Sequence, residues 1–79
     1  MKKYEDKRNV IGNLIYEYRT KKKLTKVQLS KLLELHAVNL DHTEIKRIET
    51  GRMIVKDFEL VALCIVLDIS YEDLKNTIL

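Results

Sequence analysis

The stretch that decides the fold lies near the middle of the chain and reads Asp41-His42-Thr43-Glu44-Ile45-Lys46-Arg47-Ile48-Glu49-Thr50-Gly51-Arg52. Asp41 and Glu44 form a capping box, a pair of side chains that satisfies free backbone N–H groups at the start of a helix. Ile45 and Ile48 are spaced to face a core, and Gly51 suits the left-handed position at which helices commonly end. The stretch therefore predicts a short helix with one buried side and one polar side.

The polar side of this helix carries hydrogen-bond donors and positive charge. Its outward positions are His42, Thr43, Lys46 and Arg47. Arginine and lysine can donate to O6 and N7 of guanine, and threonine can bond a base or touch the thymine methyl group. These four residues are therefore the candidate base contacts, whereas Glu44 is assigned to helix capping.

Helical spacing continues on both sides of this stretch. The chain has no proline, only two glycines and no run of alternating apolar and polar residues, so strands are not expected. The other expected helices run from Val10 to Lys22 with Asn9 as cap, from Thr25 through Leu29, Leu32, Leu33 and His36, from Asp57 or Phe58 to about Asp68, and from Ser70, in a second capping box with Asp73, to the C-terminus. The sequence predicts an all-α fold of five short helices in one domain, residues 1–79, with residues 1–8 as a charged N-terminal arm.

The charge is divided unevenly along the chain. The net charge is +3 overall, and residues 1–52 hold 13 Lys and Arg against 7 Asp and Glu, a net of +6, whereas residues 53–79 hold 2 against 5, a net of −3. A basic first part of this size favours a polyanionic partner. The division also argues against a purely structural adaptor that never binds nucleic acid.

The sequence favours a cytoplasmic protein without membrane association. The charged N-terminus lacks the apolar core of a signal peptide, and the longest apolar run, Leu60 to Leu67, is far shorter than the roughly 20 residues that cross a bilayer. The single cysteine, Cys64, cannot form an internal disulfide and suits a small buried hydrophobe.

The sequence shows no arrangement typical of catalysis or metal binding. Its carboxylates form no convincing catalytic pair, and it has no glycine-rich phosphate loop and no nucleophile with an associated base. His36, His42 and Cys64 do not have a spacing typical of metal ligands. We therefore expect no enzymatic activity, no metal or other cofactor, and no small-molecule effector site.

Two segments together resemble the Xre/Cro-type helix-turn-helix family of bacterial and phage repressors, namely Leu24-Thr25-Lys26-Val27-Gln28-Leu29-Ser30 and the stretch quoted above. The resemblance covers about residues 9–75, and its most specific part is Ile45 to Gly51. It implies a five-helix, lambda-repressor-like fold whose third helix, at about residues 42–50, enters the major groove of double-stranded DNA. It also implies a sequence-specific transcriptional regulator, which in this family is often a repressor.

The resemblance also assigns roles by position. The base contacts would be the four outward residues of the third helix. The phosphate contacts would be Thr25, Lys26, Thr50 and Arg52. Family members commonly pair an arginine late in the first helix with a glutamate late in the third, and these positions hold Arg19 and Glu49. An arginine fork on that carboxylate would fix the angle at which the third helix is presented.

The chain departs from the family pattern before the third helix. Lys26 replaces a usual glutamine, so a directional hydrogen bond becomes a point charge, and Lys23 stands where glycine is usual. The interval from Leu29 to Ile45 is several positions longer than the common pattern and lacks its glycine. This resembles a subgroup with an extended second helix and a longer loop, and it leaves the angle of the third helix open.

Two further expectations concern particular side chains around the insertion and the fourth helix. Leu35, Val38 and Leu40 are expected to pack under the longer loop, and Lys56 replaces the usual N-cap of the fourth helix.

The fourth helix is apolar nearly all round. Its expected inward stripe is Leu60, Leu63, Cys64 and Leu67, and Val61 and Ile65 lie on a different face. That face is covered either by another part of the chain or by a partner, and we favour a symmetric dimer because two recognition helices one DNA turn apart read a palindrome. The predicted dimer or partner surface comprises Val61, Ile65, Tyr71, Leu74 and Ile78.

An alternative function uses the same fold as a protein-interaction module, such as the antitoxin of a toxin–antitoxin pair. The apolar face of the fourth helix would then dock a different protein. Antitoxins often carry an extra segment that wraps the toxin, and the sequence shows none after residue 79. We therefore prefer the DNA-binding regulator.

Overall fold

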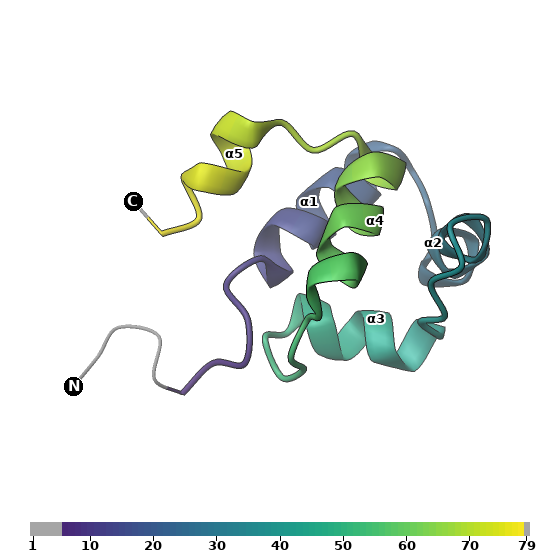
Figure 1. Cartoon of the computed structure of the whole chain (residues 1–79), viewed down its shortest axis with the longest axis horizontal. Coiled ribbons are helices and arrows are strands. Elements are labelled where there is room, and N and C mark those ends of the chain that lie inside the picture. Colours follow the sequence, from purple (N-terminus) through teal and green to yellow (C-terminus); the bar gives the residue numbers. More distant parts are fainter. Residues whose placement is uncertain (1–5, 79) are drawn as a thin grey trace.

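The computed structural model describes residues 6–78, which form five helices and no strand (Figure 1). The helices are α1 (Gly12–Lys21), α2 (Lys26–Glu34), α3 (His42–Glu49), α4 (Asp57–Leu67) and α5 (Tyr71–Lys75). The predicted all-α fold of five helices is confirmed. Residues 1–5 of the predicted N-terminal arm lie outside the described residues.

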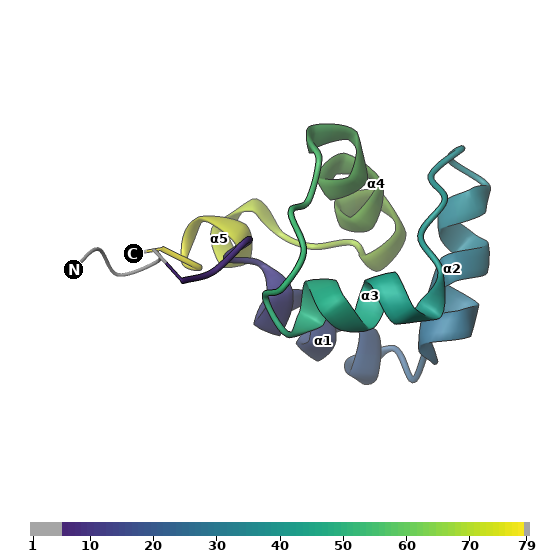
Figure 2. The same ribbon diagram turned by 90° about the horizontal axis from the view of Figure 1, so that it is seen from below.

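The first four helices enclose one small core. Figure 2 shows α2 standing at a steep angle to α3, with α4 lying above α3 and beside the upper part of α2. The core side chains come from α1 to α4, from the residue before α1 and from the loop between α2 and α3; they are Ile11, Ile15, Leu29, Leu33, Val38, Leu40, Ile45, Ile48, Ala62, Leu63 and Leu67. The polar side of α3 therefore faces away from the core because both of its isoleucines are buried in it.

Local hydrogen bonds explain where the helices begin. Thr25 and Gln28 form a complete capping box on α2, and Asp41 and Glu44 form the predicted one on α3. The hydroxyl oxygen of Ser70 accepts from the backbone N–H of Asp73 at 3.1 Å and so caps α5. These bonds satisfy N–H groups that the first turn of a helix leaves without backbone partners.

The N-terminus of α1 begins two residues later than predicted. The side-chain oxygen of Asn9 accepts from the N–H groups of Ile11 and Gly12, at 3.1 and 2.9 Å. Asn9 therefore caps the start of α1, as predicted. Helix α5 is also shorter than predicted, because it ends at Lys75.

The end of α2 and the loop between α2 and α3 differ from the prediction in two ways. Val38 and Leu40 are buried, but Leu35 is 79% exposed and does not pack under the loop. Helix α2 is not extended, since it ends at Glu34, and Ala37 takes the left-handed conformation (φ +59°) that glycine would take more easily.

The buried face of α4 differs from the predicted inward stripe. Leu63 and Leu67 are buried as expected, but Leu60 and Cys64 are only half-buried. Glu59 is buried instead, and its carboxylate accepts from the backbone N–H of Lys56 at 2.9 Å. This bond supports the start of a helix whose N-cap position, Lys56, makes no side-chain cap.

Helices α1 and α3 touch backbone to backbone. A Cβ atom on Gly12 would collide with the carbonyl oxygen of Ile48 and lie 2.8 Å from that of Glu49. Only glycine allows this approach, so the start of α1 fixes the position of the end of α3.

Candidate nucleic-acid interface

The outward face of α3 presents all four predicted base contacts to solvent. His42, Thr43, Lys46 and Arg47 are exposed. At 100° per residue, Thr43 and Lys46 lie at the middle of this face, and His42 and Arg47 lie at its two edges. No described carboxylate among residues 6–78 forms an ion pair with Lys46 or Arg47. The face is therefore a row of donors whose charges are not neutralised within the described protein.

The first turn of this face is held in place by Asp41. The Asp41 carboxylate accepts from the hydroxyl of Thr43 at 2.6 Å and from the N–H of Glu44 at 2.8 Å. These two hydrogen bonds hold the pKa of Asp41 below its ordinary value, because they favour the ionised form. The Thr43 hydroxyl thus donates to the cap, and its methyl group and remaining lone pairs are left for a base.

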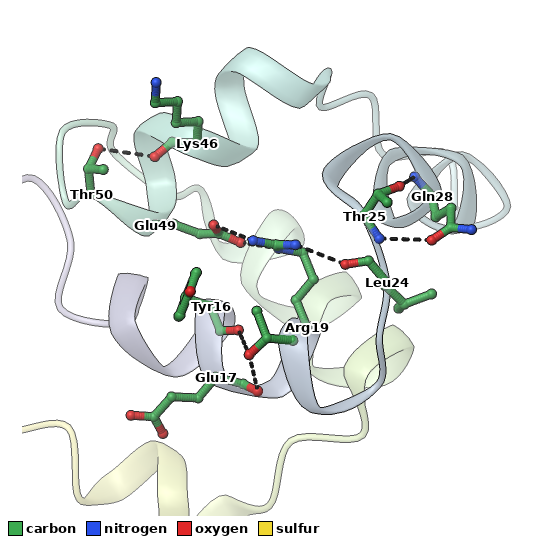
Figure 3. Close-up of polar contacts among 10 residues, drawn as sticks. Tyr16, Glu17, Arg19, Leu24, Thr25, Gln28, Lys46, Glu49 and Thr50 are labelled. Carbon is green, nitrogen blue, oxygen red and sulfur yellow. Dashed lines mark hydrogen bonds and ion pairs between the residues drawn. The ribbon is translucent and has the colours of Figure 1, made fainter.

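The predicted phosphate contacts begin with Thr25 and Lys26 at the start of α2. The hydroxyl oxygen of Thr25 accepts from the N–H of Gln28 at 3.0 Å, and the Gln28 side chain accepts from the N–H of Thr25 at 2.8 Å (Figure 3). The proton of the Thr25 hydroxyl remains available for an anion. Lys26 is half-buried and adds a positive charge to the same helix start.

The other two predicted phosphate contacts follow α3. The hydroxyl of Thr50 donates to the carbonyl oxygen of Lys46 at 3.0 Å (Figure 3) and to that of Arg47 at 3.2 Å. It must therefore turn away from its own helix before it can donate to a phosphate. Arg52 is exposed, and its backbone N–H donates to the carbonyl of Arg47 at 2.8 Å. The side chain of Arg52 is therefore free to extend beside α3.

An ion pair joins α1 to α3 beneath this interface. Arg19 donates to both carboxylate oxygens of Glu49, through Nε at 2.6 Å and Nη2 at 3.0 Å, and its Nη1 donates to the carbonyl of Leu24 at 2.8 Å (Figure 3). The two side chains are only 8% and 5% exposed. The bond to Glu49 raises the pKa of Arg19 above its ordinary value, although burial acts in the opposite direction. One side chain thus ties together α1, the turn before α2, and α3.

The structure adds a cation that the sequence analysis did not single out. The backbone N–H of Arg8 donates to the carbonyl of Gly51 at 2.9 Å, which brings the N-terminal segment to the end of α3. Arg8, Arg47 and Arg52, with Met53 and Ile54, line a surface hollow of about 270 Å³. The sequence contained these arginines, but nothing local indicated that residue 8 would lie beside residue 52.

The predicted dimer or partner surface is divided between two places. Val61 and Ile65, both 57% exposed, line a groove of about 610 Å³ with Phe58 of α4 and with Ala37 and Val38 of the loop between α2 and α3. The sequence analysis missed Phe58, which lies three residues before Val61 on the same helix face.

The remaining residues of that predicted surface lie elsewhere. Tyr71, Leu74 and Ile78 line a separate hollow of about 300 Å³ together with Val10, Ile11 and Leu60. No residue lines both hollows, so the five residues do not form one continuous patch.

Two observations bear on other kinds of site. Within residues 6–78, no three His, Cys, Asp or Glu side chains gather as a metal site would require, and no helix is long and apolar enough to cross a membrane. Burial raises the pKa of the Cys64 thiol, which favours its neutral form.

Comparison with known proteins gives one match. The helix-turn-helix family designated HTH_3 matches residues 15–74, which include α2 to α4 whole, most of α1 and all of α5 except its last residue. No curated protein and no solved structure matches the chain. The matched residues span the capped α2–α3 pair, the buried Arg19–Glu49 link and the exposed face of α3. The chain belongs to the Xre/Cro-type helix-turn-helix family of DNA-binding domains.

Proposed function

We propose that this protein is a sequence-specific transcriptional regulator that reads the major groove of double-stranded DNA with α3. The observation that carries this proposal is the exposed row of donors on a helix that is capped at its start and anchored beneath by a buried ion pair. A rigid helix loses little conformational entropy on binding, so its side chains can discriminate between bases.

The contacts divide by role. His42, Thr43, Lys46 and Arg47 are the proposed base contacts and give sequence preference. Thr25, Lys26, Thr50 and Arg52 are the proposed phosphate contacts, which supply salt-sensitive affinity and set the orientation of the domain on the duplex.

Repression is the proposed outcome of binding. A protein that occupies a promoter blocks transcription by exclusion alone, whereas activation also requires a productive contact with the transcription machinery. The DNA-binding face described above is sufficient for the first mechanism, and such a protein would work in the cytoplasm of a bacterial cell, where the DNA lies.

The proposed functional unit is a homodimer. The exposed apolar side chains of α4, Phe58, Val61 and Ile65, line a groove whose burial against a second copy would remove them from water. A two-fold arrangement would also present two copies of α3 to a palindromic site.

The deciding experiment is selection of bound duplexes from a random DNA library at about 150 mM salt, near physiological ionic strength. We expect enrichment of a palindrome whose half-sites lie about 34 Å apart, one turn of DNA. Enrichment of a single half-site would retain the DNA function and exclude the dimer as the reading unit. Weak binding without any sequence preference would contradict the proposed function.

A second candidate function is favoured by the groove on α4. The groove is lined mostly by apolar side chains and by none of the proposed base or phosphate contacts. A different protein, such as the toxin of a toxin–antitoxin pair, could therefore occupy it instead of a second copy. Mass spectrometry of the complex isolated from its own cells distinguishes these cases, because a toxin partner gives a second mass in fixed stoichiometry.

A further inference from the structure

The N-terminal segment, residues 7–9, is fixed against the end of α3. Besides the bond from Arg8 N–H to the Gly51 carbonyl, the side-chain amide of Asn9 donates to the carbonyls of Ile48 and Met53, at 3.1 and 2.8 Å. The segment therefore follows the last turn of α3 and the loop after it.

Asn9 uses its whole side chain for this attachment. Its oxygen accepts from the N–H groups of Ile11 and Gly12, while its nitrogen donates to the two carbonyls. One amide thus joins the start of α1, the end of α3 and the following loop. Because Arg8 precedes Asn9 directly, these bonds determine where the Arg8 backbone lies.

The consequence is an arginine cluster, defined as Arg8, Arg47 and Arg52, around the hollow at the end of α3. All three side chains are exposed, and among residues 6–78 no carboxylate lies within 4 Å of their guanidinium groups. Like charges gathered in this way repel one another, and an anion between them relieves that repulsion. The guanidinium fork matches the oxygens of a phosphate especially well.

We propose that Arg8 and Arg52 together hold one phosphate of the DNA backbone, with Asn9 as the positioning residue that places Arg8. This inference rests on the proposed function and extends the DNA-binding surface to the N-terminal segment. Arg47, at the edge of the outward face of α3 (the reading face), would then lie between that phosphate and the major groove of the DNA. The contact fixes the register of α3 on the duplex without selecting a base.

The test measures affinity for a DNA duplex as a function of salt for the full chain and for Arg8→Ala. Loss of one phosphate contact lowers the slope of log affinity against log salt by about 0.9. The affinity advantage of the wild type should therefore shrink by about 3.5-fold between 50 and 200 mM salt. The loss should be the same for the preferred site and for its single-base variants.

Lys75→Ala is the matched control for charge. It also removes one positive charge, but it lies in α5, which Figure 1 shows across α1 and α4 from α3. We expect its salt slope to equal that of the wild type. An Arg8→Ala slope that matches the Lys75→Ala slope would overturn the proposal, while ordinary sequence-specific binding by the wild type would leave the proposed function standing.

The positioning role of Asn9 has its own readout. Asn9→Ala should lower the salt slope as much as Arg8→Ala, and the double variant should show no further decrease. A folded fraction that is the same at every salt concentration, as checked by circular dichroism, lowers the affinity by a constant factor and leaves the slope unchanged. A wild-type slope in Asn9→Ala would exclude the positioning role, and a wild-type chain that binds no duplex would overturn this inference and the proposed function together.

Discussion

Arg19 and Glu49 carry opposite charges into a region where each side chain is less than one-tenth exposed. Removing charges from water is costly, and mutual attraction offsets the cost only when the geometry is good and the remaining donors are satisfied. Here the fork is bidentate and the third nitrogen donates to the Leu24 carbonyl. The pair is therefore best understood as a device that fixes the orientation of α3.

Glu49→Gln should destabilise the fold by about 3 kcal/mol, because it leaves the buried Arg19 charge without its counter-ion. Urea unfolding measures the change. The matched control is Glu72→Gln, which breaks an exposed pair with Lys75 and should change stability by no more than about 0.5 kcal/mol. Equal effects of the two variants would contradict the structural role of the Arg19–Glu49 pair.

Among the described residues, three that are not glycine occupy left-handed backbone that favours glycine: Lys23 (φ +56°), Ala37 (φ +59°) and Asp68 (φ +55°). Ala37→Gly should raise stability by about 1 kcal/mol, since the left-handed region costs an L-residue roughly that much. The expected rise in Tm is about 4–8 °C for a domain of this size. Lys22→Gly is the control, because Lys22 has an ordinary φ of −82° and should gain nothing.

The Asp41 cap should make the start of α3 sensitive to acid. Since the folded pKa lies below the unfolded one, the carboxylate stabilises the fold fully above its unfolded pKa, and this contribution is lost as the pH falls through the folded pKa. Asp41→Asn keeps an oxygen for capping but does not titrate. Thermal unfolding should show that the difference in Tm between the wild type and Asp41→Asn changes between pH 6 and pH 2. A constant difference in Tm would argue against the lowered pKa of Asp41.

At the scale of the elements, α3 and the turn after it carry two proposed kinds of DNA contact, to bases and to phosphates, that mutation can separate. Lys46 lies at the middle of the reading face, whereas Arg52 lies beyond its end. Lys46→Ala should lose about 1–3 kcal/mol of binding free energy at the preferred site and relax the preference at one base pair. Arg52→Ala should weaken binding to all duplexes alike. Competition titrations against single-base variants of the site measure both effects.

Much of this architecture could be predicted because its causes are local. The caps at Thr25, Asp41 and Ser70 depend on residues three positions apart, so the starts of α2, α3 and α5 were correct. The predicted cap of α1 was also correct, since Asn9 accepts from the N–H groups of Ile11 and Gly12, although the regular helix begins at Gly12 and not at Val10. Leu35 was wrong because an apolar residue in a loop has no periodicity to show which way it points.

The candidate site was predictable only in part, for the same reason. The outward residues of α3 follow from helical spacing within eight residues. The arginine cluster does not, because Arg8 and Arg52 meet only through bonds from the N-terminal segment to the carbonyls that follow α3. The groove on α4 likewise depends on where the loop between α2 and α3 returns.

At the scale of the whole molecule, the dimensions suit a side-by-side pair on DNA. The domain measures 38 × 24 × 21 Å, and two copies in contact would hold equivalent helices apart by a distance comparable with the roughly 34 Å between half-sites. The exposed cations of α3, Lys46 and Arg47, would face the duplex in both copies.

Ile65→Lys should abolish the proposed dimer, because a charge would then be buried in the apolar groove. Light scattering of Ile65→Lys as it elutes from a size-exclusion column should show a mass equal to that of one chain. Ile78→Lys, in the second hollow, is the control that tells the two surfaces apart. If Ile78→Lys alone reduces the mass, the dimer uses the hollow beside α5 and not the groove on α4.

The loop between α2 and α3 forms one wall of the α4 groove, yet α3 is attached to α1 through Gly12 and the buried ion pair. In the proposed function, the surface for a binding partner and the surface that reads the operator therefore belong to separate stretches of chain. Lengthening the exposed part of this loop costs little closure entropy. Related regulators could therefore exchange loops and acquire new assembly partners while still binding the same operator sequences.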